Sequence, residues 1–383
     1  MERTILPLIA KDDFGLASQT VTLSFLVSFG LVKALSNLFA GRLSERMGRK
    51  RILVAGWLAG LGVPVLLILA PSWGWIVFAN VLLGVNQGLC WSTTVIMKID
   101  LVGPKRRGLA MGLNEAAGYL AVSFSALLTG YLAASYGLRP APFLPGLVFA
   151  GLGLLLSAFF TQETLPYARL EAAIRPNFAH SQDHSSVGPT FGQVFRWTSW
   201  QNRSLFSASQ AGLVNNLNDG LIWGLIPIFL TQHGLPLVQI VVITAIYPGV
   251  WGIGQLATGT MSDRWGRKWM IAAGMMVQAV GIGLFALGDG YAVWVLAAVL
   301  LGVGTALVYP TLLAAVSDIA DPSWRASAVG VYRMWRDSGY VIGGLLSGLL
   351  ADSLGIPITI AVIGMLTLIS GIIVASVMRE TKK

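Results

Sequence analysis

The chain has 383 residues, of which 55% are hydrophobic and only 11% are charged. Because an ordinary soluble domain carries about 25% charged residues, this composition excludes a typical soluble protein and predicts an all-α membrane protein. The net charge of +9 is compatible with a nucleic-acid partner, but the basic residues occupy short segments between apolar runs, where such residues set membrane orientation instead. We therefore expect the lipid bilayer, and no nucleic acid, among the partners.

The apolar runs give the predicted membrane helices in chain order. A helix needs about 20 apolar residues to cross the bilayer core, and eleven runs approach this length. They lie near residues 20–40, 52–70, 74–97, 108–134, 141–161, 205–230, 237–258, 270–288, 292–316, 326–350 and 357–378. The polar stretch 162–204 is predicted to be a linker, whose end (FGQVFRWTSW) has the pattern of an amphipathic helix on the membrane surface. His180 and His184 lie in this linker, where we expect no metal site.

Basic residues gather in every second connection between the predicted helices. With the linker on the same side of the membrane, that side contains Arg42, Arg46, Arg49, Lys50, Arg51, Lys98, Lys105, Arg106, Arg107, Arg264, Arg267, Lys268, Arg325, Arg379, Lys382 and Lys383. The opposite connections contain little beyond Lys11 and Arg139. By the positive-inside rule, the linker and the C-terminal tail 379–383 are expected in the cytoplasm, and the chain in the cell (inner) membrane.

An internal repeat connects the two halves of the chain. GRLSERMGRKR begins at residue 41 and GTMSDRWGRKW at residue 259, which is an offset of 218 residues. The same offset, without a gap, aligns LLGVNQGLCWSTT (82–94) with LLGVGTALVYPTL (300–312). Identical spacing over so long a stretch indicates a duplicated bundle. Residues 1–161 and 205–378 are therefore predicted to form an N-terminal and a C-terminal bundle.

The same offset makes a prediction about the start of the chain. The partner of 205–230 would begin ahead of Met1, and only its second half is present, as MERTILPLIA. We expect this stub to be the end of a truncated first helix, so that the visible helices are numbers two to twelve. The alternative is a protein with eleven helices.

The two charged stretches identify a family resemblance. GRLSERMGRKR follows a predicted helix, matches the pattern G-x-L-[A/S]-D-R-x-G-R-[K/R]-[K/R] except for Glu45, and recurs with Asp263 in the second half. In these features the chain resembles the major facilitator superfamily (MFS) over its whole length. The resemblance implies two six-helix bundles related by a pseudo-twofold axis, with a central site that opens to each side in turn.

The resemblance also implies that the charged stretches act as a conformational latch. Its candidate residues are Gly41, Glu45, Arg46, Gly48, Arg49, Lys50, Gly259, Asp263, Arg264, Gly266, Arg267 and Lys268. We expect Gly41 and Gly48 to bracket a tight turn, and Arg46, Arg49 and Lys50 to face lipid headgroups and the other bundle. Glu45 is expected to accept hydrogen bonds from the free N–H groups that open the helix 326–350, near Ala326. The alternative is that these charges only fix the topology.

Polar side chains within the predicted helices are the candidates for substrate binding or ion coupling, because charges there are expensive and usually functional. They are Lys33, Asn114, Glu115, Asn216, Asp219, Trp223, Tyr332, Arg333, Arg336 and Asp337. Arg333 and Asp337 are four residues apart and are expected to pair. Arg336 would then remain unpaired, line the central cavity and bind an anionic group. A static lock between the bundles is the alternative for this cluster, and for Lys33 in particular.

The function expected from these features is secondary transport. Neither a Walker loop nor an H-E-x-x-H pair occurs, so we expect a transporter rather than an enzyme, without cofactors. An ion-coupled exporter of a small organic solute is favoured, with protons as possible partners and a monomer as the expected state. The run 74–97 has no arginine and 108–134 no Gly-Pro pair, both common in proton-coupled exporters of the family. Facilitative or symport uptake of an organic anion, and a non-transporting membrane sensor, therefore remain alternatives.

Overall fold

The computed structural model describes residues 6, 9, 13–15, 19–102, 106–174 and 189–381. Within these ranges the chain is helical, and none of the described residues forms a strand. The prediction of a truncated first helix rests on residues 1–10, most of which lie outside the described residues. His180 and His184 lie outside them as well.

The N-terminal half consists of long helices that follow the predicted runs. They are α2 (Gln19–Met47), α3 (Arg49–Leu69), α4 (Trp73–Val102), α5 (Arg107–Tyr136) and α6 (Leu144–Leu155), which a short 3-10 turn (Ala141–Phe143) precedes and a π-turn (Leu156–Phe160) extends. At a rise of about 1.5 Å per residue, helices of 20 to 30 residues are long enough to cross a bilayer.

The C-terminal half repeats this pattern. Its helices are α9 (Arg203–Gly224), α10 (Ile226–Gln232), α11 (Leu237–Trp265), α12 (Lys268–Leu287), α13 (Tyr291–Ile319), α14 (Arg325–Leu354) and α15 (Ile356–Val377). The predicted run 205–230 is therefore interrupted, because α9 ends at Gly224 and α10 begins at Ile226.

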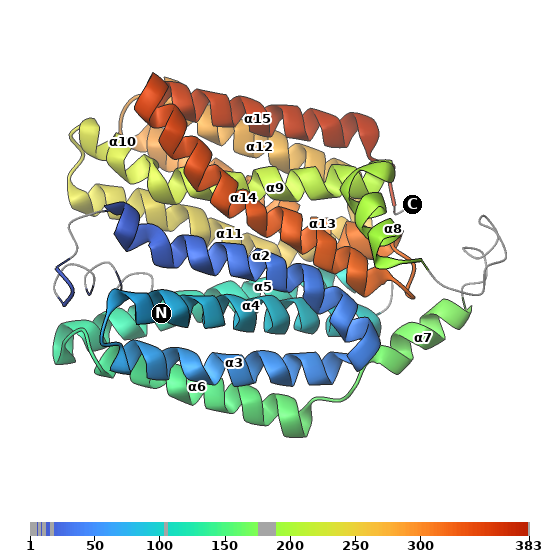
Figure 1. Ribbon diagram of the computed structural model, residues 1–383. Coiled ribbons are helices and arrows are strands. Elements are labelled where there is room, and N and C mark those ends of the chain that lie inside the picture. The colour runs from blue at the N-terminus through green and yellow to red at the C-terminus, as the bar shows by residue number, and fades with distance from the viewer. Residues whose placement is uncertain are drawn as a thin grey trace.

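The predicted linker contains helical segments of its own. The end of the linker forms α8 (Phe191–Arg196) and a π-turn (Trp197–Gln201), as its pattern predicted, and a capping box between Thr190 and Gln193 starts α8. The helix α7 (Leu165–Ile174) was not predicted. Its Pro166 lies in the first turn, where proline removes no helical hydrogen bond. We call the end of the molecule where α7, α8 and the end of α15 lie the linker end (Figure 1).

The two halves pack against each other through two equivalent helix pairs. In Figure 1 the C-terminal half lies above the N-terminal half, and α2 runs alongside α14 while α11 runs alongside α5. By the offset of 218 residues, α2 corresponds to α11 and α5 to α14, so exchanging the halves converts one pair into the other. The fold thus has the two bundles that the repeat predicted, in the pseudo-twofold arrangement that the family resemblance implied.

Two glycines of each charged stretch have different roles. Gly48 and Gly266 end α2 and α11 with φ of 93°, a conformation that favours glycine. Gly41 and Gly259 instead lie inside these helices, where a side chain on either would collide with the backbone of the opposite half, at Ala326 and Gly108 respectively. The prediction that Gly41 begins a tight turn was therefore wrong, because α2 continues as a helix to Met47.

Candidate functional site

Glu45 joins α2 of the N-terminal half to the start of α14. The backbone N–H of Ser327 donates to one carboxylate oxygen (2.7 Å) and the Ser327 hydroxyl donates to the other (2.5 Å). Because α14 begins at Arg325, this N–H belongs to the first turn, which lacks helical partners and favours a negative charge. The predicted contact of Glu45 with the start of this helix is confirmed, at Ser327.

Asp263 makes the equivalent contact between the halves on the other side of the pseudo-twofold axis. Its two carboxylate oxygens accept hydrogen bonds from the backbone N–H groups of Gly108 (3.0 Å) and Leu109 (2.9 Å), at the start of α5. Together the two carboxylates hold each half to the first turn of a helix in the other. The structure is therefore closed at the linker end.

The arginines of the two stretches form ion pairs within their own half. Arg49 pairs with Asp100 (3.1 Å), and Arg267 pairs with both Asp318 (3.0 Å) and Asp263 (2.8 Å). Arg49 and Arg267 are buried, so the prediction that Arg49 faces lipid headgroups was wrong: a buried guanidinium needs a carboxylate partner. Arg46 and Arg264 are exposed and take no part in these buried contacts.

Two further carboxylates, which were not predicted, cap the helices that follow the charged stretches. Glu163 accepts hydrogen bonds from the backbone N–H groups of Arg49 (2.9 Å) and Lys50 (3.1 Å), and Glu380 does the same for Arg267 (2.8 Å) and Lys268 (3.1 Å). Burial raises the pKa of Glu163, but the backbone hydrogen bonds and Arg49 outweigh it and leave this pKa below its ordinary value. The signal was available, because residues 163 and 380 are 217 apart, one short of the repeat offset.

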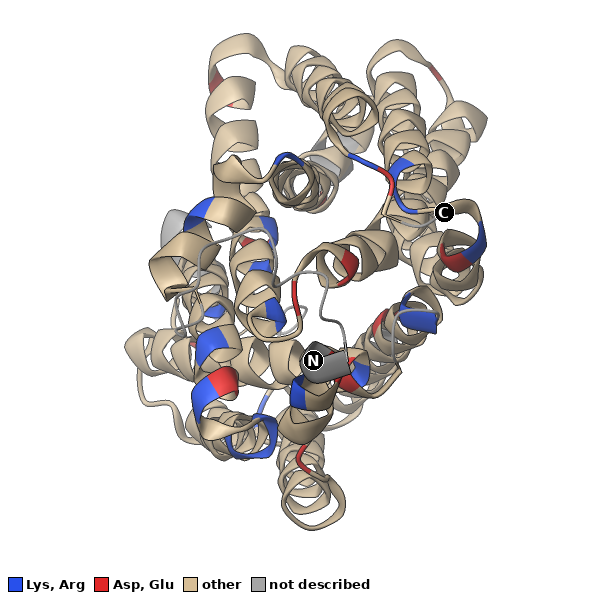
Figure 2. Cartoon of the chain, turned by 90° about the vertical axis from the view of Figure 1, so that its right-hand side faces the viewer, with Lys and Arg blue, Asp and Glu red and all other residues tan. Residues whose placement is uncertain are grey.

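Glu171 on α7 connects both halves at the linker end. Its carboxylate pairs with Arg107 (2.9 Å), where α5 begins, and with Arg325 (2.8 Å), where α14 begins. Arg107 also pairs with Asp318 (3.1 Å). Figure 2 looks onto this end and shows basic positions on several neighbouring helices, interspersed with acidic ones. Glu171 lies outside the charged stretches, so the repeat gave no reason to single it out.

A second charged cluster lies between the halves, around Asp337 of α14. One carboxylate oxygen accepts hydrogen bonds from Arg336 (2.7 Å) and from the Asn216 amide (3.5 Å), and the other accepts one from Asn37 (2.5 Å) and lies 3.8 Å from Lys33. The prediction that Asp337 pairs with Arg333 was wrong. The guanidinium of the adjacent Arg336 folds back onto the carboxylate, a reach that helical spacing alone does not reveal.

Arg333, three residues before Arg336, is the arginine of this cluster that lacks a partner among the described residues. Its side chain is fully buried, and none of its three nitrogen atoms has a hydrogen-bond partner among the described residues. A buried neutral donor without a hydrogen-bond partner destabilises a protein by about 1–3 kcal/mol, and a buried charged donor without one destabilises it by more. The unpaired guanidinium that the sequence predicted therefore exists, but at Arg333 instead of Arg336.

Glu115 of α5 faces the same interior. One carboxylate oxygen accepts from Trp91 (3.1 Å) and Asn114 (2.9 Å), and the other is buried without a partner among the described residues. Asn114 in turn accepts from Lys98 (2.5 Å). Glu115 and Arg333 are equivalent by the 218-residue offset, so opposite charges with unmet hydrogen bonds occupy equivalent positions.

The remaining candidates divide between the interior and the surface. Asp219 is buried and accepts a hydrogen bond from the Tyr247 hydroxyl (2.5 Å). Tyr332 is buried in an apolar cluster to which both halves contribute. Trp223 is 53% exposed at the end of α9, and its assignment to the central site stays a prediction.

Aromatic rings complete the centre. Tyr119 of α5 lies 4.0 Å from Trp251 of α11, measured between ring centroids, and its hydroxyl donates to that of Tyr309 on α13 (3.1 Å). The guanidinium of Arg336 stacks over the Tyr309 ring at 5.0 Å. Tyr119 and Tyr309 were not singled out from the sequence, although Tyr309 is the repeat equivalent of Trp91. The centre thus combines charged and aromatic groups from both halves.

Comparisons of sequence place this arrangement among known proteins. The profile of the Major Facilitator Superfamily matches residues 3–210 and 208–383. The quinolone resistance protein NorA of Staphylococcus aureus is 26% identical over 136 residues, which are 36% of this chain and 35% of NorA. An uncharacterized MFS-type transporter of Salmonella typhimurium is 22% identical over 92% of this chain and 85% of its own length. The chain thus spans about a third of NorA.

Solved structures share the fold over nearly the whole chain. The human organic anion transporter MFSD10 (TETRAN) has a TM-score of 0.73 at 19% identity, covering 95% of this chain and 87% of that one. The proton:xylose symporter XylE has a TM-score of 0.77 at 16% identity, covering 100% of this chain and 90% of that one. At these identities the likeness concerns the fold alone.

Proposed function

The chain belongs to the Major Facilitator Superfamily, and we propose that it is a secondary transporter that moves a small organic solute by alternating access. The observation that carries the proposal is the pair of equivalent contacts, Glu45 with Ser327 and Asp263 with Gly108 and Leu109. Hydrogen bonds to a charged group contribute about 1.5–3 kcal/mol each. A gate made of so few of them can close one end and still open reversibly.

The buried centre is the proposed substrate site. Arg333 offers unmet donors in the fork geometry that suits a carboxylate or phosphate. The rings of Tyr119 and Trp251 pack against each other, and Tyr119 donates to Tyr309, whose ring lies under Arg336. The proposed solute is therefore a small organic molecule with an anionic group, and the static-lock alternative explains Asp337 and Lys33 better than it explains Arg333.

We propose that transport is export and that it is coupled to protons. The name of NorA favours export. Buried carboxylates without an ion pair among the described residues are the groups that could take up a proton, and Glu115 has an unmet oxygen. We assign the linker end to the cytoplasm, because the basic residues gather there, and the chain to the cell membrane as a monomer.

The test is flux through the purified protein in proteoliposomes with an imposed pH gradient. Expected is movement of aromatic carboxylates that is driven by the gradient and lost in the Glu115→Gln protein. Flux that ignores the gradient would favour facilitated diffusion. Solutes that bind without crossing the membrane would contradict transport and favour a sensor.

A further inference from the structure

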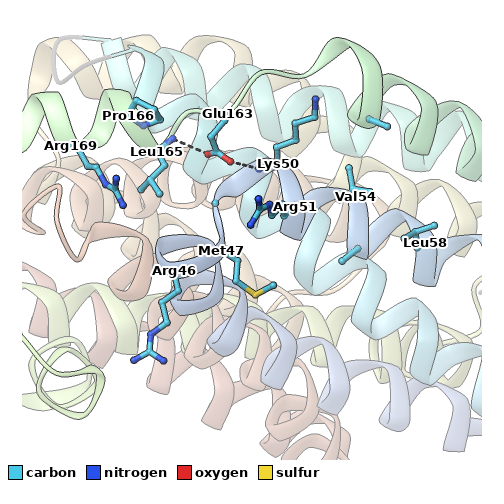
Figure 3. Close-up of a pocket in the computed structure, with 13 residues that line it drawn as sticks. Arg46, Met47, Lys50, Arg51, Val54, Leu58, Glu163, Leu165, Pro166 and Arg169 are labelled. Carbon is cyan, nitrogen blue, oxygen red and sulfur yellow. Dashed lines mark hydrogen bonds between the residues drawn. The ribbon is translucent and has the colours of Figure 1, made fainter.

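A groove of about 790 Å³ lies on the surface of the N-terminal half at the linker end (Figure 3). Its basic lining residues come from three helices, Arg46 from α2, Lys50 and Arg51 from α3, and Arg169 from α7. Neither the gate nor the central site uses these side chains. The groove therefore needs an explanation of its own.

The groove is strongly positive. Glu163 is the only acidic residue that lines it, and its oxygens already accept backbone hydrogen bonds from Arg49, Lys50 and Leu165. Arg46, Arg51 and Arg169 are exposed, and none of them forms an ion pair within the described part of the chain. Their charges are available to an anion from outside.

The wall of the groove further along α3 is apolar. Along α3 the groove continues past Arg51 to Val54 and Leu58, and Leu58 is 56% exposed on the outer surface of a membrane-spanning helix. From residue 51 to residue 58 the helix rises about 10 Å. The groove thus has a cationic end and an apolar end, in the order of a phospholipid headgroup and its acyl chain.

We infer that this groove binds an anionic phospholipid. Its phosphodiester contacts Arg51 and Arg169, since a guanidinium binds phosphate in a bidentate manner, and an acyl chain lies along Val54 and Leu58. If these basic residues only fixed the topology, charges in the loop after α2 would be sufficient. The position of Arg169, which α7 brings to the groove, would then have no explanation. The repeat-equivalent surface lacks this arrangement, because Trp269 stands at the position equivalent to Arg51.

The test measures lipid binding to the full-length protein, which makes it independent of transport. The purified, delipidated protein is titrated with phosphatidylglycerol or phosphatidylcholine, and bound lipid is counted by native mass spectrometry. Expected is a clear preference for phosphatidylglycerol, and a loss of about 30-fold in its affinity in the Arg51→Gln/Arg169→Gln protein, from about 1 kcal/mol per basic residue.

The matched control removes the same charge elsewhere at the linker end. Arg203 and Arg264 are exposed and do not line the groove, so Arg203→Gln/Arg264→Gln should change the affinity less than about threefold. Equal loss in both double variants would overturn the proposal in favour of general attraction. Equal displacement by soluble glycerol phosphate would overturn it in favour of a free phosphate ligand. Thermal unfolding of each variant identifies any that has lost its fold.

Discussion

Two buried arginines on consecutive turns of α14 have opposite surroundings. Arg336 contacts Asp337 through two nitrogen atoms and stacks on Tyr309, so its charge is compensated within the protein. Arg333 has no such partner among the described residues, although its side chain is equally buried. In a protein that spans a membrane, an uncompensated charge is retained at a cost to stability. We therefore expect Arg336 to stabilise the folded protein and Arg333 to bind the solute.

Replacing each arginine by glutamine should separate these roles. Arg336→Gln leaves Asp337 without its nearest cation and should destabilise the protein by about 3–5 kcal/mol, as breaking a buried pair does, which would appear as a lower folded yield. Arg333→Gln should keep or raise the folded yield and abolish flux of anionic solutes, with partial recovery in Arg333→Lys. Flux per folded molecule, measured in vesicles, distinguishes a role in solute binding from a role in stability. Normal flux in Arg333→Gln would return this residue to the static-lock explanation.

At the scale of helices, the apolar runs and the internal repeat predicted the positions of the long helices and the equivalence of the two halves. All long helices lie where apolar runs of sufficient length predicted them, and the offset of 218 residues anticipated that Glu45 and Asp263 play equivalent parts. What it did not predict depends on tertiary contacts. The helix α7 has only ten residues, so a search for apolar runs of about 20 residues does not find it. Its position is defined by Glu171, whose partners Arg107 and Arg325 are 64 and 154 residues away.

Because α7 is held through Glu171, its contact with the two halves should respond to acid. Burial raises the pKa of Glu171, but the hydrogen bonds and charges of Arg325 and Arg107 outweigh it and place this pKa below its ordinary value of 4.5. A carboxylate whose pKa is lower in the folded than in the unfolded state stabilises the contact above about pH 4.5. This stabilisation is lost as the pH falls through the pKa of the folded state. The contribution of Glu171 to closure should therefore be constant near neutrality and be lost in acid, which should raise the open fraction.

The variant Glu171→Gln should show a larger open fraction at pH 7 and a smaller acid-induced change. Glu163 also has a lowered pKa but caps α3 within one half, so Glu163→Gln is the matched control and should keep the acid-induced opening. Accessibility of an engineered cysteine at the linker end to a membrane-impermeant thiol reagent, followed from pH 7 to 3.5, measures the open fraction. The native Cys90 is buried. An unchanged acid response in Glu171→Gln would show that another carboxylate governs the opening.

At the scale of the whole molecule, the two halves meet at the linker end through the equivalent contacts of Glu45 and Asp263 and through the ion pairs of Glu171 with Arg107 and Arg325. Glu45 and Asp263 bind different helices and share no partner, so their contributions to closure should add in free energy. Each of Glu45→Gln and Asp263→Asn should shift the open-to-closed ratio about tenfold, from a loss of at least about 1.4 kcal/mol, and the double variant about a hundredfold.

Spin labels at Leu101 on α4 and Trp265 on α11, both exposed at the linker end of opposite halves, report the separation directly. If the halves move as rigid bodies, either single variant should populate the same long distance as the double variant, and only the fraction should differ. Three different distances would mean that each contact closes its own helix pair independently. That result would contradict rigid-body closure, because a change on one side of the pseudo-twofold axis would then leave the other side in place.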